Sequence, residues 1–244
     1  MTAIKPLDFT TLLAVETRKM TDTRSARWTL GVIVGLTAAA LAWKVGHGDI
    51  PVSFHNYMNP VTAIVAFGAP IIGLLAMTSE WTQRTALTTF TLAPRRLSVI
   101  AAKFLASTML SLALLSVGLL LALGATALGG AIHGDATYGA TFGDLRGALV
   151  IVLLQVVMAA AFGALAAQTA IALVAFLAAP TIWGNIAPEL LKGVAPWFDV
   201  FDAYNRLSSD RAFDHWAQTL TSIAIWIVIP AVIGVARSIR REVK

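Results

Sequence analysis

Residues 99–128 read VIAAKFLASTMLSLALLSVGLLLALGATAL and contain a single charged residue, Lys103. At about 1.5 Å per residue, a helix of this length spans about 45 Å, whereas the hydrocarbon core of a bilayer is about 30 Å thick. The stretch therefore predicts a transmembrane helix that either tilts or extends beyond the bilayer on one side.

Five further stretches are apolar and long enough to span a membrane, which gives six predicted spans in all. They occupy residues 28–43, 59–78, 147–167, 169–184 and 218–236. The chain is 57% hydrophobic and 13% charged, against about 45–50% and about 25% in soluble domains. The sequence predicts an all-α polytopic membrane protein in which residues 1–244 form one transmembrane domain.

The distribution of Lys and Arg predicts how the spans are oriented. One set of segments carries 13 of these residues, namely 1–27, 79–103 and 237–244. The other set carries 5, namely 44–58, 129–146 and 185–217. Because cytoplasmic loops are enriched in Lys and Arg, the first set and both termini are expected in the cytoplasm. These flanking charges also explain the pI near 9.9, so no nucleic-acid partner is expected.

The polar segment 1–27 contains a pattern typical of an amphipathic helix lying in the membrane interface, over residues 7–20. Apolar residues recur at helical spacing, and Glu16 and Lys19 are among the polar ones; the apolar set is Phe9, Leu12 and Leu13. Such a helix would hold basic residues against anionic headgroups. An ordinary anchor next to the first span fits the same residues.

Two connections between the later spans are distinctive. Spans four and five are separated only by Ala167–Thr169, which predicts a tight helical hairpin. The longest segment between spans, 185–217, is expected on the outer side, with a first half apolar enough to re-enter the interface as short helices.

The predicted spans have no Asp, Glu, Lys, Arg or His in their cores. Such residues mark proton relays and ion pathways, so their absence argues against a proton-coupled antiporter and a charged pore. It also leaves an intramembrane enzyme without a catalytic set, and no catalytic residue is predicted. The chain has no Cys, and its four His fall in outer loops without metal-ligand spacing, so no metal site is expected.

Milder polar groups within the spans are the candidates for contacting a transported molecule. Gln155, Met158 and Phe162 share one helical face at i, i+3 and i+7, and Thr62 lies in the second span. Such a face suits an amphipathic or apolar cargo. An interhelical hydrogen bond from Gln155 is the simpler alternative.

The segment 80–93 predicts a helix of about three turns at the cytoplasmic surface, between spans two and three. Glu80 would lie in its first turn, with Arg84 four residues on, and Pro94 would end it before Arg95 and Arg96 at headgroup level. The chain has no G-x-x-x-x-G-K-[ST] motif, so energy for uphill transport would come from a nucleotide-driven partner docked at this segment. A helix that merely connects two spans on the lipid surface is the alternative.

These residues resemble the coupling-helix region of ABC-2 type permeases. The resemblance is carried by Ser79-Glu80, Arg84-Thr85 and Leu92-Ala93-Pro94-Arg95-Arg96, followed by Ala102-Lys103 at the start of a long span. Glu16-x-x-Lys19, Thr23-Arg24-Ser25 and Trp28 are similar to the interfacial entry helix of that family. Arg84 stands where the family often has Gly, which affects the details of docking.

The resemblance implies a permease subunit of an ABC exporter in the bacterial inner or plasma membrane. It would pair with a second copy or a sister permease and move a drug, antimicrobial peptide or lipid outward. ATP and Mg would bind to a separate ATP-binding cassette subunit, and this chain would hold no cofactor. The implied docking residues are Glu80, Trp81, Arg84, Leu87, Arg95 and Arg96, supported from the side by Glu16 and Lys19.

A rival hypothesis is an ATP-independent membrane scaffold or lipid-interacting regulator, whose 80–93 helix rests on lipid. The two differ in whether a P-loop ATPase associates with the chain. The sequence alone does not separate the candidate cargos, or a homodimeric from a heterodimeric permease.

Overall fold

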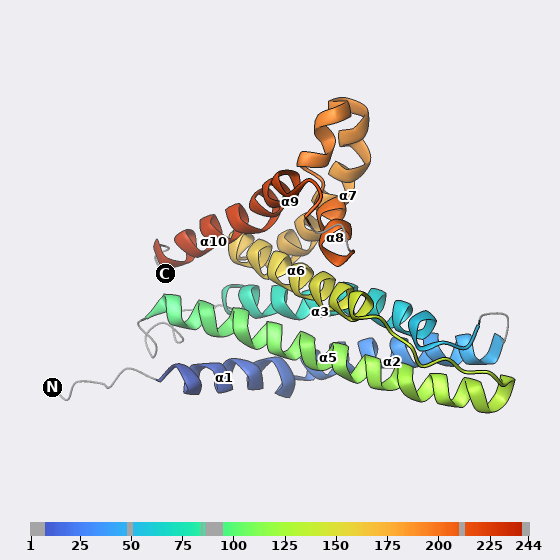
Figure 1. Ribbon diagram of the computed structural model, residues 1–244. Helices are drawn as coiled ribbons and strands as arrows, with labels where there is room; N and C mark the ends of the chain where they lie inside the picture. Colours follow the sequence, from blue (N-terminus) through green and yellow to red (C-terminus); the bar gives the residue numbers. More distant parts are fainter. Residues whose placement is uncertain (1–7, 48–50, 84, 86–94, 210–212, 241–244) are drawn as a thin grey trace.

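The computed structural model describes residues 8–47, 51–83, 85, 95–209 and 213–240, which are mainly α-helical (Figure 1). The α-helices are α1 (Phe9–Asp22), α2 (Arg24–His47), α3 (Phe54–Thr82), α5 (Arg96–His133), α6 (Phe142–Ala166), α7 (Thr169–Leu191), α8 (Val200–Ser208), α9 (Trp216–Ile223) and α10 (Ile229–Arg240). A 3₁₀-helix covers Lys192–Trp197 and a π-helical turn covers Ala224–Val228. Within the described residues, the one β-bridge pairs Ser53 with Thr137.

Six helical stretches among the described residues are long and apolar enough to cross a membrane, which supports a multi-pass membrane protein. They are Arg24–His47, Phe54–Thr82, Arg96–His133, Phe142–Ala166, Thr169–Trp197 and Trp216–Arg240. The number of spans predicted from the sequence is therefore confirmed. The helices are longer than the predicted spans, because the helical backbone continues beyond the apolar stretch at one end or at both.

The centre of the bundle is formed by α3 and α6, with α5 packed along them (Figure 1). Buried residues make up 67% of the apolar stretch of α3 but 22% of that of α2, so α2 lies at the periphery. Gly163 of α6 lies so close to α3 that an added Cβ would come within 3.0 Å of the carbonyl oxygen of Leu74. Small residues in α6 thus allow the backbones to approach closely, as the sequence pattern indicates.

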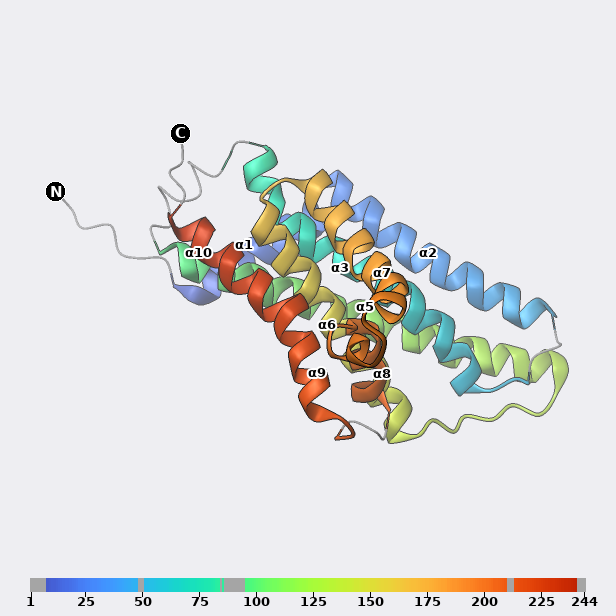
Figure 2. The same cartoon turned by 90° about the horizontal axis from the view of Figure 1, so that it is seen from above.

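The α6–α7 connection is a turn of two residues, as predicted. Ala167 has φ 52°, and its N–H donates to the carbonyl of Gly163, which closes the end of α6. Chain direction consequently reverses at the end of the bundle where α1 begins and α10 ends (Figure 2). We call this end the basic end, because it carries Arg18, Lys19, Arg24, Arg27, Arg95, Arg96, Lys103, Arg237 and Arg240.

Residues 185–217, which were predicted to form the segment between spans five and six, are largely helical where the structure describes them. Helix α7 continues past Gly184 to Leu191, and the 3₁₀-helix and α8 follow it. Two hydrogen bonds hold this region on the last span: Trp226 Nε1 donates to the carbonyl of Phe198 at 2.6 Å, and Ser222 Oγ donates to that of Trp197 at 2.9 Å. Span five is therefore longer than residues 169–184.

Candidate functional site

Three residues of α1, each four positions after the last, are buried against the bundle: Leu12, Glu16 and Met20. Leu12 packs against Val99 and Ala102 of α5, which seats the helix on the bundle. The stripe places a carboxylate between two apolar side chains. Glu16 is consequently 3% exposed, which requires a partner for its charge.

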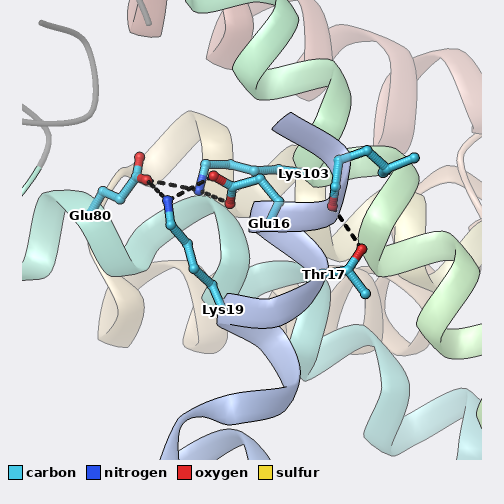
Figure 3. Close-up of polar contacts among 6 residues, drawn as sticks. Glu16, Thr17, Lys19, Glu80 and Lys103 are labelled. Atoms are coloured by element: carbon cyan, nitrogen blue, oxygen red, sulfur yellow. Dashed lines mark hydrogen bonds and ion pairs between the residues drawn. The ribbon is translucent and has the colours of Figure 1, made fainter. Parts of the chain in front are cut away.

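Four charged side chains from three helices meet at this point, and we call them the ion cluster: Glu16 and Lys19 of α1, Glu80 of α3 and Lys103 of α5 (Figure 3). Lys19 Nζ lies 2.7 Å from Glu16 Oε1 and 2.9 Å from Glu80 Oε1. Lys103 Nζ lies 2.8 Å from Glu16 Oε2 and 3.2 Å from Glu80 Oε1. Each ammonium therefore contacts both carboxylates, and the four charges sum to zero.

Three members of the ion cluster are buried, which corrects the expectation for Glu80. Glu80 is 6% exposed and lies in the last turn of α3, not in the first turn of a separate surface helix. Lys103 is 4% exposed, and its ammonium is bonded within the bundle. A buried ion pair adds little net stability over an apolar replacement, but losing one partner is costly, so the cluster fixes how α1, α3 and α5 pack.

The opposite side of the end of α3 is bonded to the start of α7. Thr169 Oγ1 lies 2.8 Å from Thr78 Oγ1 and 3.1 Å from Thr82 Oγ1. The last two turns of α3 are thus bonded on one side to α1 and α5 and on the other to α7. Movement of this helix end would therefore displace three other helices, α1, α5 and α7.

The remaining predicted docking residues are spread over the basic end. Arg96 Nη1 donates to the carbonyls of Ser238 and Ile239, at 3.2 and 3.1 Å, which joins the start of α5 to the end of α10. Arg95 is exposed just before α5, and Trp81 is partly exposed in the last turn of α3. Arg84, Leu87 and most of the predicted helix 80–93 lie outside the described residues.

The candidate cargo-contacting residues do not form one open surface. Met158 and Phe162 are 1% and 8% exposed and pack in a core with Phe176, Tyr204 and Trp226. Gln155, on the same helix, is partly exposed, but its Oε1 is buried and accepts no hydrogen bond from the described residues. The alternative of an interhelical bond to this oxygen is therefore not seen there.

Thr62 lines a cavity of about 560 Å³ between α3, the start of α6 and the end of α8, far along the bundle from the ion cluster. Its hydroxyl donates to the carbonyl of Met58 at 3.1 Å, so it bonds its own helix. Whether these four residues contact a transported molecule stays a prediction.

Sequence reasoning missed Lys103 as a site residue and assigned Glu16 to a polar face. Two signals were present: Glu16 falls midway between Leu12 and Met20 at four-residue spacing, and Lys103 is the single charge in the longest apolar stretch. Each implies a buried charge that needs an opposite partner. The pairing itself joins positions 87 residues apart, which local patterns do not reveal.

The pKa of Lys19 is raised above its ordinary value of 10.5. Burial lowers it, but hydrogen bonds to Glu16 and Glu80 and the charges of these carboxylates outweigh that effect. The stability that Lys19 contributes is therefore fully present below about pH 10. It is lost as the pH rises through the raised pKa.

Lys19→Met is expected to cost less than about 1 kcal/mol at neutral pH, because the Lys19 side chain is 43% exposed and Lys103 still contacts both carboxylates. Thermal unfolding of both chains between pH 7 and pH 11 measures this. The difference between them should stay constant to about pH 10 and then shrink. A difference that grows above pH 10 would contradict the assignment of Lys19 as a charged member of the cluster.

Within the described residues, no group of three or more His, Asp or Glu is placed to hold a metal ion. Comparison of the chain with protein-family models, curated proteins and solved structures gave no match.

Proposed function

We propose that this chain is the membrane-spanning subunit of an ABC-2 type exporter that moves a hydrophobic or amphipathic molecule outward. A separate ATP-binding cassette subunit would dock on the segment between α3 and α5, at the cytoplasmic face. Six helices of membrane-spanning length and the resemblance of residues 79–103 to the coupling-helix region of ABC-2 permeases support the proposal.

The ion cluster is the main structural observation that supports the proposal. Helix α3 ends at Thr82, two residues after Glu80, and α5 begins at Arg96, seven residues before Lys103. A docking segment between them would therefore be fixed at both ends to helices that share one buried ion cluster. Because separating a buried carboxylate from its ammonium is costly, displacement of that segment would move α1, α3 and α5 together.

The position of ionisable groups also favours an external energy source. In the described parts of the six spans, these side chains lie within about two turns of a helix end, for example Glu80, Lys103 and Asp144. A relay that carries protons through the bilayer would need some of them near mid-membrane.

Affinity purification of the tagged chain from its own host tests the proposal. A protein with a P-loop should co-purify, and the pair in liposomes should hydrolyse ATP faster when cargo is present. Glu80→Gln should leave the pair assembled but reduce the cargo stimulation by roughly tenfold, within the 1–3 kcal/mol typical of coupling between sites.

Glu189→Gln is the matched control, because it makes the same chemical change at an exposed position near the far end of α7. It should keep the stimulation unchanged. Recovery of no P-loop protein, or equal behaviour of the two variants, would overturn the proposal and favour the ATP-independent scaffold.

A further inference from the structure

A cavity of about 470 Å³ lies in the angle between α1 and α2, facing the last turns of α3. This volume is within the range of about 300–1,000 Å³ that ligand sites occupy. The site belongs to the basic end of the bundle, next to the ion cluster, and Glu16, Lys19, Glu80 and Lys103 form part of its lining.

The lining combines buried apolar side chains with the buried charges of the ion cluster, and polar side chains lie at its exposed edge. Its most buried members other than the cluster residues are Met20, Ile72 and Ala76, at 6%, 5% and 7% exposure. Its exposed members include Ser25 and Gln83. A ligand that matches this lining has an apolar part against Met20, Ile72 and Ala76 and a polar part at the exposed edge.

The charges around the mouth favour an anion. Both carboxylates of the lining are bonded to Lys19 and Lys103, so their charge is compensated. The bend between α1 and α2 carries two further exposed arginines, Arg24 and Arg27, against one exposed acid, Asp22. The first turn of α2, with Ser25 and Ala26 in the lining, adds the partial positive charge of a helix N-terminus.

The residues around the cavity indicate that its ligand is a lipid and not a soluble metabolite. Helix α2, which contributes to the lining, also carries exposed apolar side chains: Trp28, Val32 and Leu36 are 75%, 53% and 56% exposed. Exposed apolar side chains on a membrane-spanning helix face acyl chains, and Trp is enriched at headgroup level. The excess of Lys and Arg puts this end of the bundle on the side of the leaflet that is rich in anionic lipids.

We propose that this cavity binds one anionic phospholipid of the cytoplasmic leaflet. The phosphate lies at the mouth, near Lys19 and the first turn of α2, and an acyl chain lies against Met20, Ile72 and Ala76. The lipid would bridge the α1–α2 bend and the end of α3. The test of this site uses the chain without an ATPase, so its outcome is distinguishable from that of the proposed function.

Photo-crosslinking with phosphatidylglycerol that carries a diazirine on its acyl chain tests the site. The purified chain is placed in nanodiscs of phosphatidylcholine, labelled with a low fraction of the probe and mapped by mass spectrometry. Label should appear around Met20 and Ile72–Ala76, and unlabelled phosphatidylglycerol should compete for it. A phosphatidylcholine probe should label these positions about tenfold less, a difference of ~1.4 kcal/mol in binding.

Ala26→Trp places an indole in the cavity mouth and should reduce this label by about tenfold. Val32→Trp adds the same side chain to the exposed face of α2 and should leave it unchanged. Equal labelling by the two lipid probes, or label spread evenly over the exposed face of α2, would overturn the proposal. The labelling pattern of the unsubstituted chain decides this even where the Ala26 variant does not fold.

Discussion

Lys103→Met is expected to lower the free energy of unfolding by roughly 3–5 kcal/mol, the usual cost of removing one partner from a buried ion pair. Lys103 is 4% exposed and contacts Glu16 and Glu80. Without it, two buried carboxylates share the single ammonium of Lys19. Methionine keeps most of the side-chain volume, so the loss reports charge and not a cavity.

Thermal unfolding in detergent, followed by tryptophan fluorescence, measures this effect. The double variant Glu16→Gln with Lys103→Met should recover a large part of the loss, because it removes one charge of each sign and leaves Lys19 to pair with Glu80. Lys192→Met is the control, since Lys192 is exposed and far from the ion cluster. A double variant no more stable than Lys103→Met alone would show that the cluster does not act as a set of paired charges.

The number of spans was predictable because apolar length is a local property of the sequence. The helix ends were not, because hydropathy does not report backbone conformation. Helix α5 begins at Arg96 and ends at His133, so it extends beyond the predicted residues 99–128 at both ends. The same reason explains Glu80: the sequence places it after an apolar stretch, but α3 continues through it to Thr82.

The candidate site was predictable in part. The resemblance to ABC-2 permeases indicated Glu16, Lys19 and Glu80 as site residues, and in the structure these three lie together with Lys103. Helical periodicity predicted that Met158 and Phe162 share one face of a helix, but it does not predict which elements pack against that face. In the fold it meets α7, α8 and the π-helical turn, an arrangement set by the path of the chain after Ala167.

The tight contact between α10 and α6 leads to the second large prediction. An added Cβ at Gly234 would lie 2.6 Å from the backbone nitrogen of Leu165 and 2.7 Å from the carbonyl carbon of Ala164. Backbone atoms do not rotate away as a side-chain end does. Gly234→Ala therefore has to push the two helices apart, and overpacking of this kind costs about 1–3 kcal/mol, and more for a branched residue.

Gly35→Ala, in the peripheral helix α2, separates this packing effect from helix propensity. An added Cβ at Gly35 has nothing within 4 Å, so the substitution should stabilise its helix by up to about 1 kcal/mol. The same exchange is thus expected to have opposite signs at the two positions, as measured by thermal unfolding. Equal effects would mean that α10 does not lie against α6 at Gly234.

The consequences of Gly234→Ala should extend beyond stability. Arg237 Nη1 donates to the carbonyl of Leu165 at 3.3 Å, and Arg96 Nη1 donates to the carbonyls of Ser238 and Ile239. All three bonds depend on α10 lying close to the ends of α6 and α5. Displacing α10 would therefore loosen the start of α5, seven residues before Lys103, and amide hydrogen exchange in Arg96–Lys103 should rise in this variant but not in Gly35→Ala. Unchanged amide hydrogen exchange in Arg96–Lys103 would show that the effect of Gly234→Ala is confined to the α6–α10 contact. Displacement of the last span would then not reach the ion cluster.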